Sequence, residues 1–371
     1  MAGDCQEVQI FAAIKLSMKK HNFSAGPAIL PQEVLSQASD AVRELDGSGL
    51  SLIEISHRSK EFIAIMEEAC ALALELSGLE NTNYRAIFLQ GGASTQFLMA
   101  AYNLLDTKAG YINTGSWSDK AIKEAKLFGE VVELASSKSA NYNHIPKDYA
   151  VTNDLDYVHL TTNNTIFGTQ FHDIPVLSAP LVADMSSDIF SRPFDYNKFG
   201  LFYAGAQKNL GPAGTTLVIA NMDLLGKVPR KVPSMMDYSL MIAKESMFNT
   251  PPVFAVYTAM LNMRWIKAQG GLDAVGQINA EKAQQLYQEI DRNTAFTGFA
   301  APDDRSQMNA TFNLTDTNTA QRFDALWNEA GISGLKGHRS VGGYRASIYN
   351  ALPLESVQLL VEVMKEFERT L

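Results

Sequence analysis

The chain has only two cysteines, Cys5 and Cys70, among its 371 residues. A disulfide-stapled scaffold and a cysteine-rich zinc site both need more thiols than this, so neither is expected. A chain of this length buries an extensive core without such supports. We therefore predict no metal site and no structural disulfide.

The lack of excess positive charge and of long apolar runs excludes two further classes of protein. Positive charge is not in excess: 31 Lys and Arg stand against 40 Asp and Glu, for a net charge of −9. A broad contact with a nucleic-acid backbone needs a basic surface, so nucleic acid is not an expected partner. No stretch approaches the ~20 continuous apolar residues that a membrane span requires. The composition predicts a globular, cytoplasmic protein without a membrane partner.

The beginning of the chain has a character of its own. Its apolar run 10–14 is short, and Asp4 and Glu7 precede it where an export signal has Lys or Arg. We expect a native start near Met18, with residues 1–17 outside the fold. At roughly 150 residues per domain, the remaining length predicts two domains. The predicted division is a large domain over 32–270 and a small domain formed by 18–31 and 271–371.

Short β-rich runs alternate with helical patterns from about residue 80 to 221. Several runs are almost continuously apolar, as in strands covered on both faces. This alternation predicts right-handed crossovers and an α/β fold with a mostly parallel, seven-stranded sheet flanked by helices. Helices are predicted over 94–106 and 118–129, the second capped by Ser118 and closed by Gly129. The predicted strands are 84–90, 109–115, 131–135, 156–162, 180–186, 201–207 and 215–221.

After residue 252 the pattern becomes looser, which favours a smaller α+β domain at the C-terminus. Helical patterns cover 253–292, including a long segment at 253–269. The elements predicted beyond them are a strand at 309–315, a helix at 318–330, a strand at 344–350 and a final helix from about 354.

Lys208 is the first candidate for chemistry. It leaves an apolar strand and enters the turn Asn209–Gly214, which is rich in Gly and Pro. Ligands of such sheets bind beyond the carboxyl ends of the strands, which is where this amine is expected. A lone lysine in a loop is usually just solvated. A lysine that forms a Schiff base needs a lowered pKa in a partly dry pocket.

The ends of other predicted strands carry residues that fit a Schiff-base role for this lysine. Asp184 ends a second apolar strand, and a carboxylate there suits a pyridinium N–H, although an Asp that only caps a turn looks the same. The segment Gly91–Thr95 opens a helix, where free backbone N–H groups favour a phosphate. Trp117 suits stacking on a flat ring, with core packing as the alternative. Thr165 suits a bond to a ring oxygen, with turn capping as the alternative. One flat, phosphorylated aldehyde uses all of these groups, namely pyridoxal 5′-phosphate.

Longer motifs then carry a family resemblance. The segments 22–31 (NFSAGPAILP), 56–62 (SHRSKEF) and 337–351 (GHRSVGGYRASIYNA) are similar to the N-terminal signature and the substrate-binding segments of the phosphoserine aminotransferase family. This family belongs to the class V, fold-type I, pyridoxal-phosphate-dependent aminotransferases, and the resemblance runs from about residue 20 to the C-terminus. It implies a homodimer with shared active sites.

The resemblance also implies roles for individual residues. Lys208 would bind the cofactor as a Schiff base, Asp184 would pair with the pyridine nitrogen, Trp117 would stack on the ring and Thr165 would contact its 3′ oxygen. The cofactor phosphate would be held by Ala93, Ser94 and Gln207, and by Asn249 and Thr250 of the partner subunit. Some relatives carry Gly-Arg in place of Ala93-Ser94, so phosphate binding here would depend more on backbone amides.

The implied reaction is a ping-pong transamination between L-glutamate and 3-phosphohydroxypyruvate that gives O-phospho-L-serine and 2-oxoglutarate, in serine biosynthesis. Formation of 4-phosphohydroxy-L-threonine, in pyridoxine biosynthesis, stays open. Arg345 is implied for the α-carboxylate of each substrate. The groups implied for the distal phosphate or side-chain carboxylate are His57, Arg58, His338 and Arg339, the first two expected from either subunit.

Four alternatives remain at this point. Alanine–glyoxylate and serine–glyoxylate aminotransferases share the chemistry, but their substrates have no distal phosphate for these basic pairs. A cysteine desulfurase needs a mobile catalytic cysteine, whereas Cys70 lies in an apolar helical pattern. A Rossmann oxidoreductase needs a glycine fingerprint that this chain lacks. A non-catalytic binding protein would not need both Lys208 and Asp184.

Overall fold

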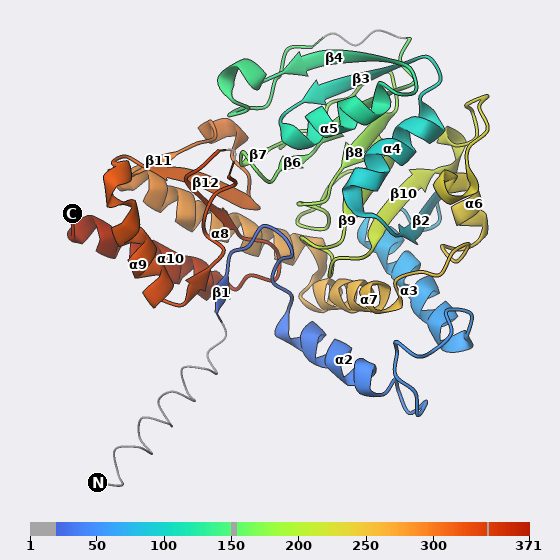
Figure 1. The fold of residues 1–371 in the computed structure, drawn as a ribbon, viewed down its shortest axis with the longest axis horizontal. Coiled ribbons are helices and arrows are strands. Elements are labelled where there is room, and N and C mark those ends of the chain that lie inside the picture. Colours follow the sequence, from blue (N-terminus) through green and yellow to red (C-terminus); the bar gives the residue numbers. More distant parts are fainter. Residues whose placement is uncertain (1–19, 150–153, 340) are drawn as a thin grey trace.

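The computed structural model describes residues 20–149, 154–339 and 341–371. The chain forms two lobes: a large one around a central sheet and a smaller one that contains the C-terminus (Figure 1). The predicted extension 1–17 lies outside the described residues. Within the described ranges, no helix is both long enough and apolar enough to cross a membrane.

Seven strands form the central sheet of the large lobe, in the order β2-β10-β9-β8-β5-β3-β4. Neighbouring strands are parallel except at β10, which is antiparallel to both β2 and β9. The mostly parallel sheet predicted from the sequence is confirmed. Its strands are β2 (Tyr84–Leu89), β3 (Lys108–Asn113), β4 (Glu130–Ser136), β5 (Tyr157–Thr161), β8 (Leu181–Asp184), β9 (Phe199–Gly205) and β10 (Thr216–Asn221).

Helices cover both faces of this sheet, and successive side chains of a strand point to opposite faces. In β2, Ala86 and Phe88 pack into one hydrophobic cluster, whereas Ile87 and Leu89 pack into another. Because both faces are buried, the strands carry continuous apolar runs. The first cluster includes α2 (Gln32–Arg43), α3 (Lys60–Leu76) and α7 (Val253–Ala268), and the second includes α4 (Gly92–Leu104), α5 (Ser116–Ala125) and α6 (Tyr238–Ala243).

Helix α5 corrects one sequence prediction. The helix predicted over 118–129 with Ser118 as its N-cap runs from Ser116 to Ala125 instead. The turn that precedes it is made by Gly115, whose φ of 150° disfavours any other residue and whose added Cβ would lie 2.1 Å from Asn164 Nδ2. Ser118 is therefore buried inside the first turn, with its Oγ 3.2 Å from Thr161 Oγ1.

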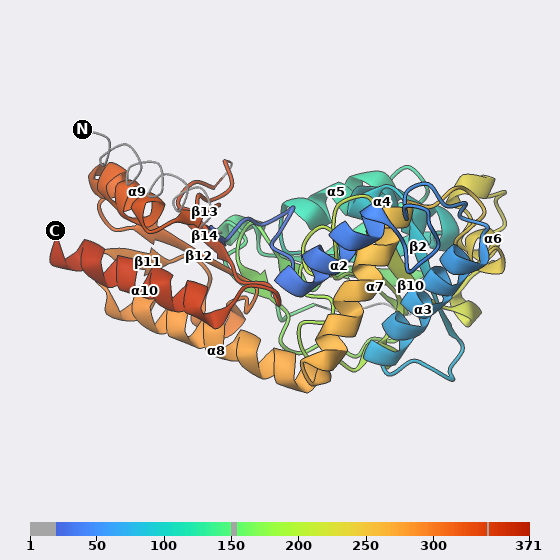
Figure 2. The same cartoon turned by 90° about the horizontal axis from the view of Figure 1, so that it is seen from below.

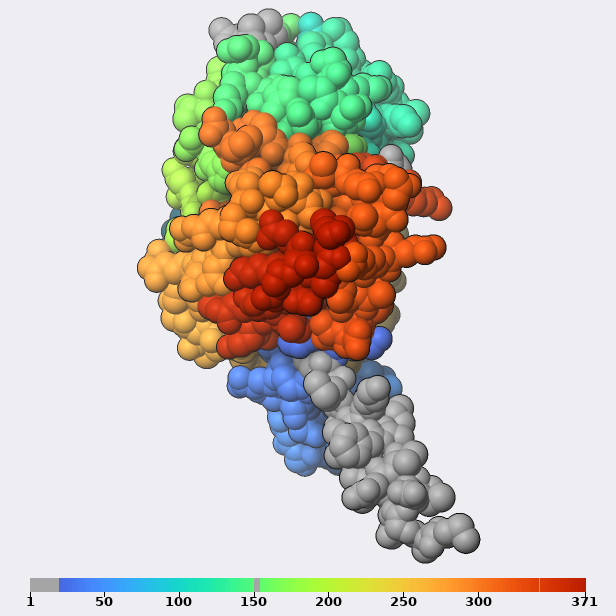
Figure 3. All heavy atoms as spheres, turned by 90° about the vertical axis from the view of Figure 1, so that its left-hand side faces the viewer, coloured from blue at the N-terminus to red at the C-terminus, as the bar shows by residue number. Residues whose placement is uncertain are grey.

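The smaller lobe has its own three-stranded antiparallel sheet, in the order β11-β12-β14. Helices α8 and α10 run side by side along it (Figure 2), and α10 crosses the outer face of the lobe (Figure 3). The elements of this lobe are α8 (Gly271–Arg292), β11 (Phe296–Gly298), β12 (Asn309–Leu314), α9 (Ala320–Glu329), β13 (Ile332–Ser333), β14 (Tyr344–Ser347) and α10 (Leu354–Arg369).

The N-terminal segment also joins the smaller lobe. Strand β1 (His21–Asn22) pairs in parallel with β13, and Phe23 and Ile29 lie in the same hydrophobic cluster as α8, α9 and α10. The core of the large lobe is separate from this cluster. These two cores support the proposed division into domains, with 18–31 and 271–371 in the small one.

Buried polar side chains join the two lobes directly behind the segment that contains Lys208. Asn350 donates from its backbone N–H to Asn209 Oδ1 at 3.0 Å and from Nδ2 to the Phe190 carbonyl at 2.8 Å. Asn279 on α8 donates to the Ser191 carbonyl at 2.8 Å. Since these amides lie in a buried environment, their bonds hold the lobes in a defined relative position.

Candidate active site

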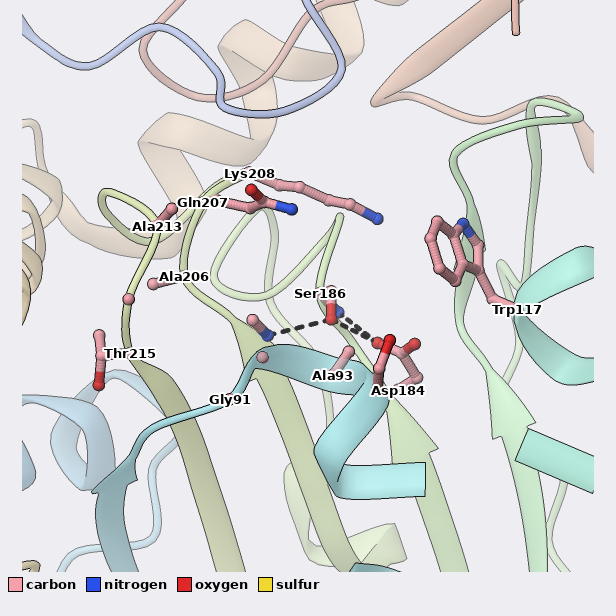
Figure 4. A pocket seen from close by; sticks show the side chains of 14 residues that line it. Gly91, Ala93, Trp117, Asp184, Ser186, Ala206, Gln207, Lys208, Ala213 and Thr215 are labelled. Atoms are coloured by element: carbon pink, nitrogen blue, oxygen red, sulfur yellow. Dashed lines mark hydrogen bonds between the residues drawn. The ribbon is translucent and has the colours of Figure 1, made fainter. Parts of the chain in front are cut away.

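A pocket opens beyond the carboxyl ends of β8 and β9 and the first turn of α4 (Figure 4). This is the position expected for a ligand of a mostly parallel sheet. Its lining combines small residues with one lysine, one carboxylate and one indole. The lining residues are Gly91, Gly92, Ala93, Ser94, Trp117, Asp184, Ser186, Gly205, Ala206, Gln207, Lys208, Ala213, Gly214 and Thr215.

Lys208 lies in the turn that follows β9 and extends across the pocket toward Trp117 (Figure 4). Its Nζ donates to Thr165 Oγ1 at 2.6 Å and lies 5.4 Å from the centroid of the Trp117 ring. Burial lowers the pKa of the Lys208 ammonium to about 8; Asp184 opposes this shift, and the Arg345 charge adds to it. The amine is therefore deprotonated far more often near neutral pH than an ordinary lysine.

Asp184, the last residue of β8, supplies a buried carboxylate beneath Lys208. Its Oδ1 accepts two hydrogen bonds from Ser186, from the backbone N–H at 2.9 Å and from Oγ at 2.6 Å. Burial raises the pKa of Asp184, although the Lys208 charge and the Ser186 bonds act in the opposite direction. Both bonds use the same oxygen, so Oδ2 is the atom that can accept a bond from a pocket ligand.

Ser186 is a site residue that the sequence reasoning missed. While its hydroxyl donates to Asp184, its Oγ accepts the backbone N–H of Gly205 at 3.0 Å. One side chain thus ties the end of β8 to the end of β9 and orients the carboxylate. The Asp-x-Ser spacing typical of an Asx turn, directly after an apolar strand, is the signal that would have found it.

The first turn of α4 forms a cup of backbone N–H groups at the base of the pocket. Gly91, the N-cap, has a φ of 102° and offers no side-chain cap. Gly205 faces this turn so closely that an added Cβ would lie 3.3 Å from Ala93 N. Ala93 and Ser94 both line the pocket. A helix N-terminus whose N–H groups lack a side-chain acceptor favours an anion, as the sequence predicted for a phosphate.

Trp117 and Thr165 complete the wall beside Lys208. Trp117 lies in the first turn of α5, and its Nε1 is buried without a hydrogen-bond partner among the described residues. Thr165 follows the short strand β6 (Asn163–Asn164), which pairs with β7 (Thr169–Gln170). The cofactor residues predicted from four separate strand ends therefore lie around one pocket.

The small domain brings basic side chains to the same place. Arg345 on β14 donates from Nη1 to the Thr165 carbonyl at 3.2 Å, and its buried Nε has no hydrogen-bond partner in the described part of the chain. Burial lowers the pKa of His338, and the charges of Arg345, Arg339 and then Lys120 lower it further. Arg345 thus lies beside Thr165, whereas His338 and Arg339 do not line the pocket, and their predicted roles stay proposals.

Besides Thr165, His338, Arg339 and Arg345, four further predicted residues do not line this pocket in the single chain. His57 and Arg58 lie in the loop between α2 and α3 and do not line it. Asn249 and Thr250 are exposed after α6 and also do not line it, although Gln90 donates from Nε2 to the Thr250 carbonyl. The roles predicted for Asn249 and Thr250 require a second subunit, and those of His57 and Arg58 involve either subunit, so all four roles stay proposals.

Comparison with known proteins identifies the family. Residues 20–360 match the aminotransferase class V family. The chain belongs to the class V aminotransferases. It is 61% identical, over 95% of its length and 99% of the relative's, to the phosphoserine aminotransferase of Flavobacterium psychrophilum. Sequence and fold thus agree on a transaminase.

Two solved structures give the same result. The phosphoserine aminotransferase from Bacillus circulans subsp. alkalophilus superposes with a TM-score of 0.92 at 46% identity, over 95% of this chain and 99% of that one. A PLP-bound phosphoserine aminotransferase from Trichomonas vaginalis gives 0.88 at 37% identity, over 94% and 100% of the two chains. The fold-type I architecture implied by the resemblance is therefore confirmed.

Cys70 is not suited to act as a catalytic nucleophile. It is a partly buried residue of α3 that packs against the main core, and burial raises the pKa of its thiol to about 12. Such a thiol is a poor nucleophile.

Within the described ranges, no group of three or more His, Cys, Asp or Glu residues is placed to hold a metal ion.

Proposed function

We propose that the chain transfers the amino group of L-glutamate to 3-phosphohydroxypyruvate, forming 2-oxoglutarate and O-phospho-L-serine in serine biosynthesis. The observation that carries this proposal is that Lys208 and Asp184 line one pocket and that Arg345, from the small domain, bonds to Thr165, the residue that also accepts from Lys208. The similarity to relatives named phosphoserine aminotransferases supports it.

Pyridoxal 5′-phosphate fits the residues present. The uncapped N-terminus of α4, with Ala93, Ser94 and Gln207, suits its phosphate, and the free Oδ2 of Asp184 suits a protonated pyridine nitrogen. Trp117 would pack on the ring and Thr165 would contact the 3′ oxygen. When bound, the cofactor would supply an aldehyde carbon that accepts the amino group and passes it on, and a ring that draws electrons from the substrate Cα.

Lys208 would act as the covalent anchor and then as the general base and acid of the reaction. Its lowered pKa allows the amine to accept the proton from the substrate Cα near neutral pH. The hydroxyl of Thr165, which holds Nζ at 2.6 Å, would keep the amine close to the reacting atoms. Asp184 would retain the proton on the ring nitrogen, since a buried carboxylate stabilises a neighbouring cation strongly.

Arg345 would bind the α-carboxylate that both substrates carry. Its Nε is buried without a partner in the described residues, which is costly unless a ligand accepts the proton. A guanidinium presents parallel N–H groups that match a carboxylate. The distal phosphate, or the side-chain carboxylate of glutamate, would then reach His338 and Arg339.

The proposed function is tested by following the two half-reactions separately in a spectrophotometer. The holoenzyme should convert glutamate to 2-oxoglutarate, and the aminated enzyme should then react with 3-phosphohydroxypyruvate far faster than with glyoxylate. A preference for glyoxylate would refute the assignment in favour of an alanine–glyoxylate or serine–glyoxylate aminotransferase. The same assay with the precursor of 4-phosphohydroxy-L-threonine tests whether the chain also forms that product.

Arg345→Ala should weaken both half-reactions. Loss of a buried charge that binds a carboxylate costs about 2 kcal/mol or more, which corresponds to roughly a 30-fold lower kcat/KM for each substrate. The matched control is Arg322→Ala, which removes an exposed arginine of α9. Equal losses for glutamate and phosphohydroxypyruvate support the assignment, whereas unchanged kinetics for both would remove Arg345 from the site.

The proposed dimer accounts for four of the predicted residues that do not line the pocket of a single chain. Asn249 and Thr250 would reach the cofactor phosphate of the partner subunit, and His57 and Arg58 would reach its substrate. Arg58, Asn249 and Thr250 are exposed and His57 is partly exposed, which supports this proposal, because side chains that serve a neighbouring subunit must project from their own. The cytoplasmic location stays a prediction from composition.

A hybrid dimer tests this sharing. One subunit carries Lys208→Ala, and the other carries His57→Ala with Arg58→Ala. If Arg58 serves the opposite subunit, one site of the hybrid keeps every group and the purified heterodimer should retain about half of the wild-type activity. If Arg58 serves its own subunit, no site of the hybrid is complete. The activity of the heterodimer should then not exceed half of the activity of the His57/Arg58 double variant.

A further inference from the structure

Helix α5 carries a second cation to the mouth of the active-site pocket. Lys120 lies one turn after Trp117, so the two side chains share a face of the helix. Lys120 Nζ lies 4.3 Å from the centroid of the Trp117 ring, and Trp117 lines the pocket. The indole thus holds the Lys120 ammonium beside the site by a cation–π contact. No ion pair of Lys120 with a carboxylate is found within the described ranges.

Lys120 also lies near the basic group on the small domain. Its charge lowers the pKa of His338, as do the charges of Arg345 and Arg339, and burial has the largest effect. Lys120 comes from the large domain and His338 from the loop before β14, so these groups meet across the boundary between the lobes. Geometry supports this proximity, because Trp117 and Val341 pack against the same cluster of Tyr142, Ile166 and Phe167, and the Val341 N–H donates to the His338 carbonyl at 2.9 Å.

The positive charges of Lys120, Arg339 and Arg345 repel one another, which costs free energy in the absence of an anion. Arg345 serves the α-carboxylate, which leaves Lys120, His338 and Arg339 for the other end of the substrate. A phosphate dianion carries twice the charge of a carboxylate and has more acceptor oxygens. A lysine suits such a group as a compact, mobile point charge.

We propose that Lys120 is a specificity-determining residue that binds the distal phosphate of the substrate together with His338 and Arg339. The identity of the substrate rests on the proposed function, whereas the anion-binding role of Lys120 does not depend on it. Through this contact the aminated enzyme favours a phosphorylated 2-oxo acid over 2-oxoglutarate, whose side chain ends in a monoanion.

Lys120→Gln tests the proposal in the holoenzyme. The concentration of 3-phosphohydroxypyruvate for half-maximal rate should rise about tenfold and that of glutamate about threefold, since a dianion feels the lost charge twice as strongly. Lys120→Arg should restore most of the difference, because it keeps the positive charge. Lys123→Gln, on the same helix, is the matched control: Lys123 is exposed and does not act on His338.

Two measurements separate this proposal from the proposed function. Inorganic phosphate should bind the wild-type holoenzyme and bind Lys120→Gln several-fold more weakly, as measured by titration of the His338 ring signal in an NMR spectrum. His338→Gln identifies that signal among the six histidines. In Lys120→Gln without phosphate, the pKa of His338 should rise, because a neighbouring positive charge is gone.

The outcomes are distinct. Unchanged phosphate binding and an unchanged phosphohydroxypyruvate requirement in Lys120→Gln overturn the role of Lys120, even if the pKa of His338 moves. Equal losses for both substrates also overturn it as a specificity residue. If the wild-type enzyme does not use phosphohydroxypyruvate but phosphate binding still depends on Lys120, the proposed function fails and the anion site stands.

Discussion

Replacing Lys208 with alanine is expected to abolish transamination and the covalent attachment of pyridoxal phosphate. The variant loses the amine that would anchor the cofactor and move the proton at the substrate Cα, so kcat should fall by about 10³-fold or more. Borohydride reduction followed by peptide mass mapping measures the attachment: the wild-type peptide around Lys208 should carry the cofactor, and the variant peptide should not.

Lys208→Arg is the matched control for charge. It keeps a cation near Thr165 and Asp184 but offers a guanidinium that stays protonated and is not a nucleophile. Activity should be lost in this variant as well. A reducible adduct that persists in Lys208→Ala would place the anchoring amine elsewhere, and the buried Lys282, whose pKa burial lowers to about 7, would be the next candidate.

Asp184→Asn is expected to have the second-largest effect. The amide keeps the shape of the side chain, and its Oδ1 can still accept both bonds from Ser186, so the fold should be retained. It cannot carry the negative charge that holds a proton on the ring nitrogen. Without that charge the ring withdraws electrons less well, and kcat should fall by about 10²-fold to 10³-fold. Steady-state kinetics at saturating substrates measure this loss.

A pH titration gives Asp184→Asn an independent readout. The pKa of Lys208 is about 8 because burial lowers it, and the Asp184 charge limits that shift. Removing the charge makes the ammonium less stable, so the pKa of Lys208 in the cofactor-free protein should fall below its wild-type value. The amine then reacts with trinitrobenzenesulfonate at a lower pH. The labelled protein is digested, and the peptide that contains Lys208 shows how far this residue has reacted.

Asp188→Asn is the matched control for a buried carboxylate. Asp188 accepts from Thr162 at 2.5 Å and from Gln170 at 3.2 Å and does not line the pocket. Its replacement should lower kcat much less than Asp184→Asn does. Equal losses in the two variants would mean that removal of any buried charge near the sheet end impairs the enzyme, which contradicts a specific bond from Asp184 to the cofactor.

Residues close together in the sequence were sufficient to predict the strands of the large domain. The predicted run 84–90 became β2 at Tyr84–Leu89, and 215–221 became β10 at Thr216–Asn221. Apolar runs bounded by turn residues are local signals, so they are visible without the fold. The position of Lys208 and Asp184 at strand ends followed from the same local pattern, which explains why the cofactor pocket was largely predictable.

Pairing between distant segments was not visible in the same way. Strand β10 runs antiparallel between β2 and β9, and its direction depends on partners far away in the chain. Helix α5 starts at Ser116 because Gly115 must pass close to Asn164, a contact between separate loops. Ser186 entered the site because its hydroxyl bridges two strand ends.

The sequence by itself determined the kind of chemistry: an apolar strand that delivers Lys208, another that delivers Asp184, and motifs shared with one family. Only the tertiary structure decided which charges act together. Trp117 of α5 and Val341 of the loop before β14 are more than two hundred residues apart, yet packing of the two lobes places both against the same hydrophobic cluster, and the charge of Lys120 thereby acts on His338. Electrostatic interactions depend on distance in space, and separation along the chain does not report that distance.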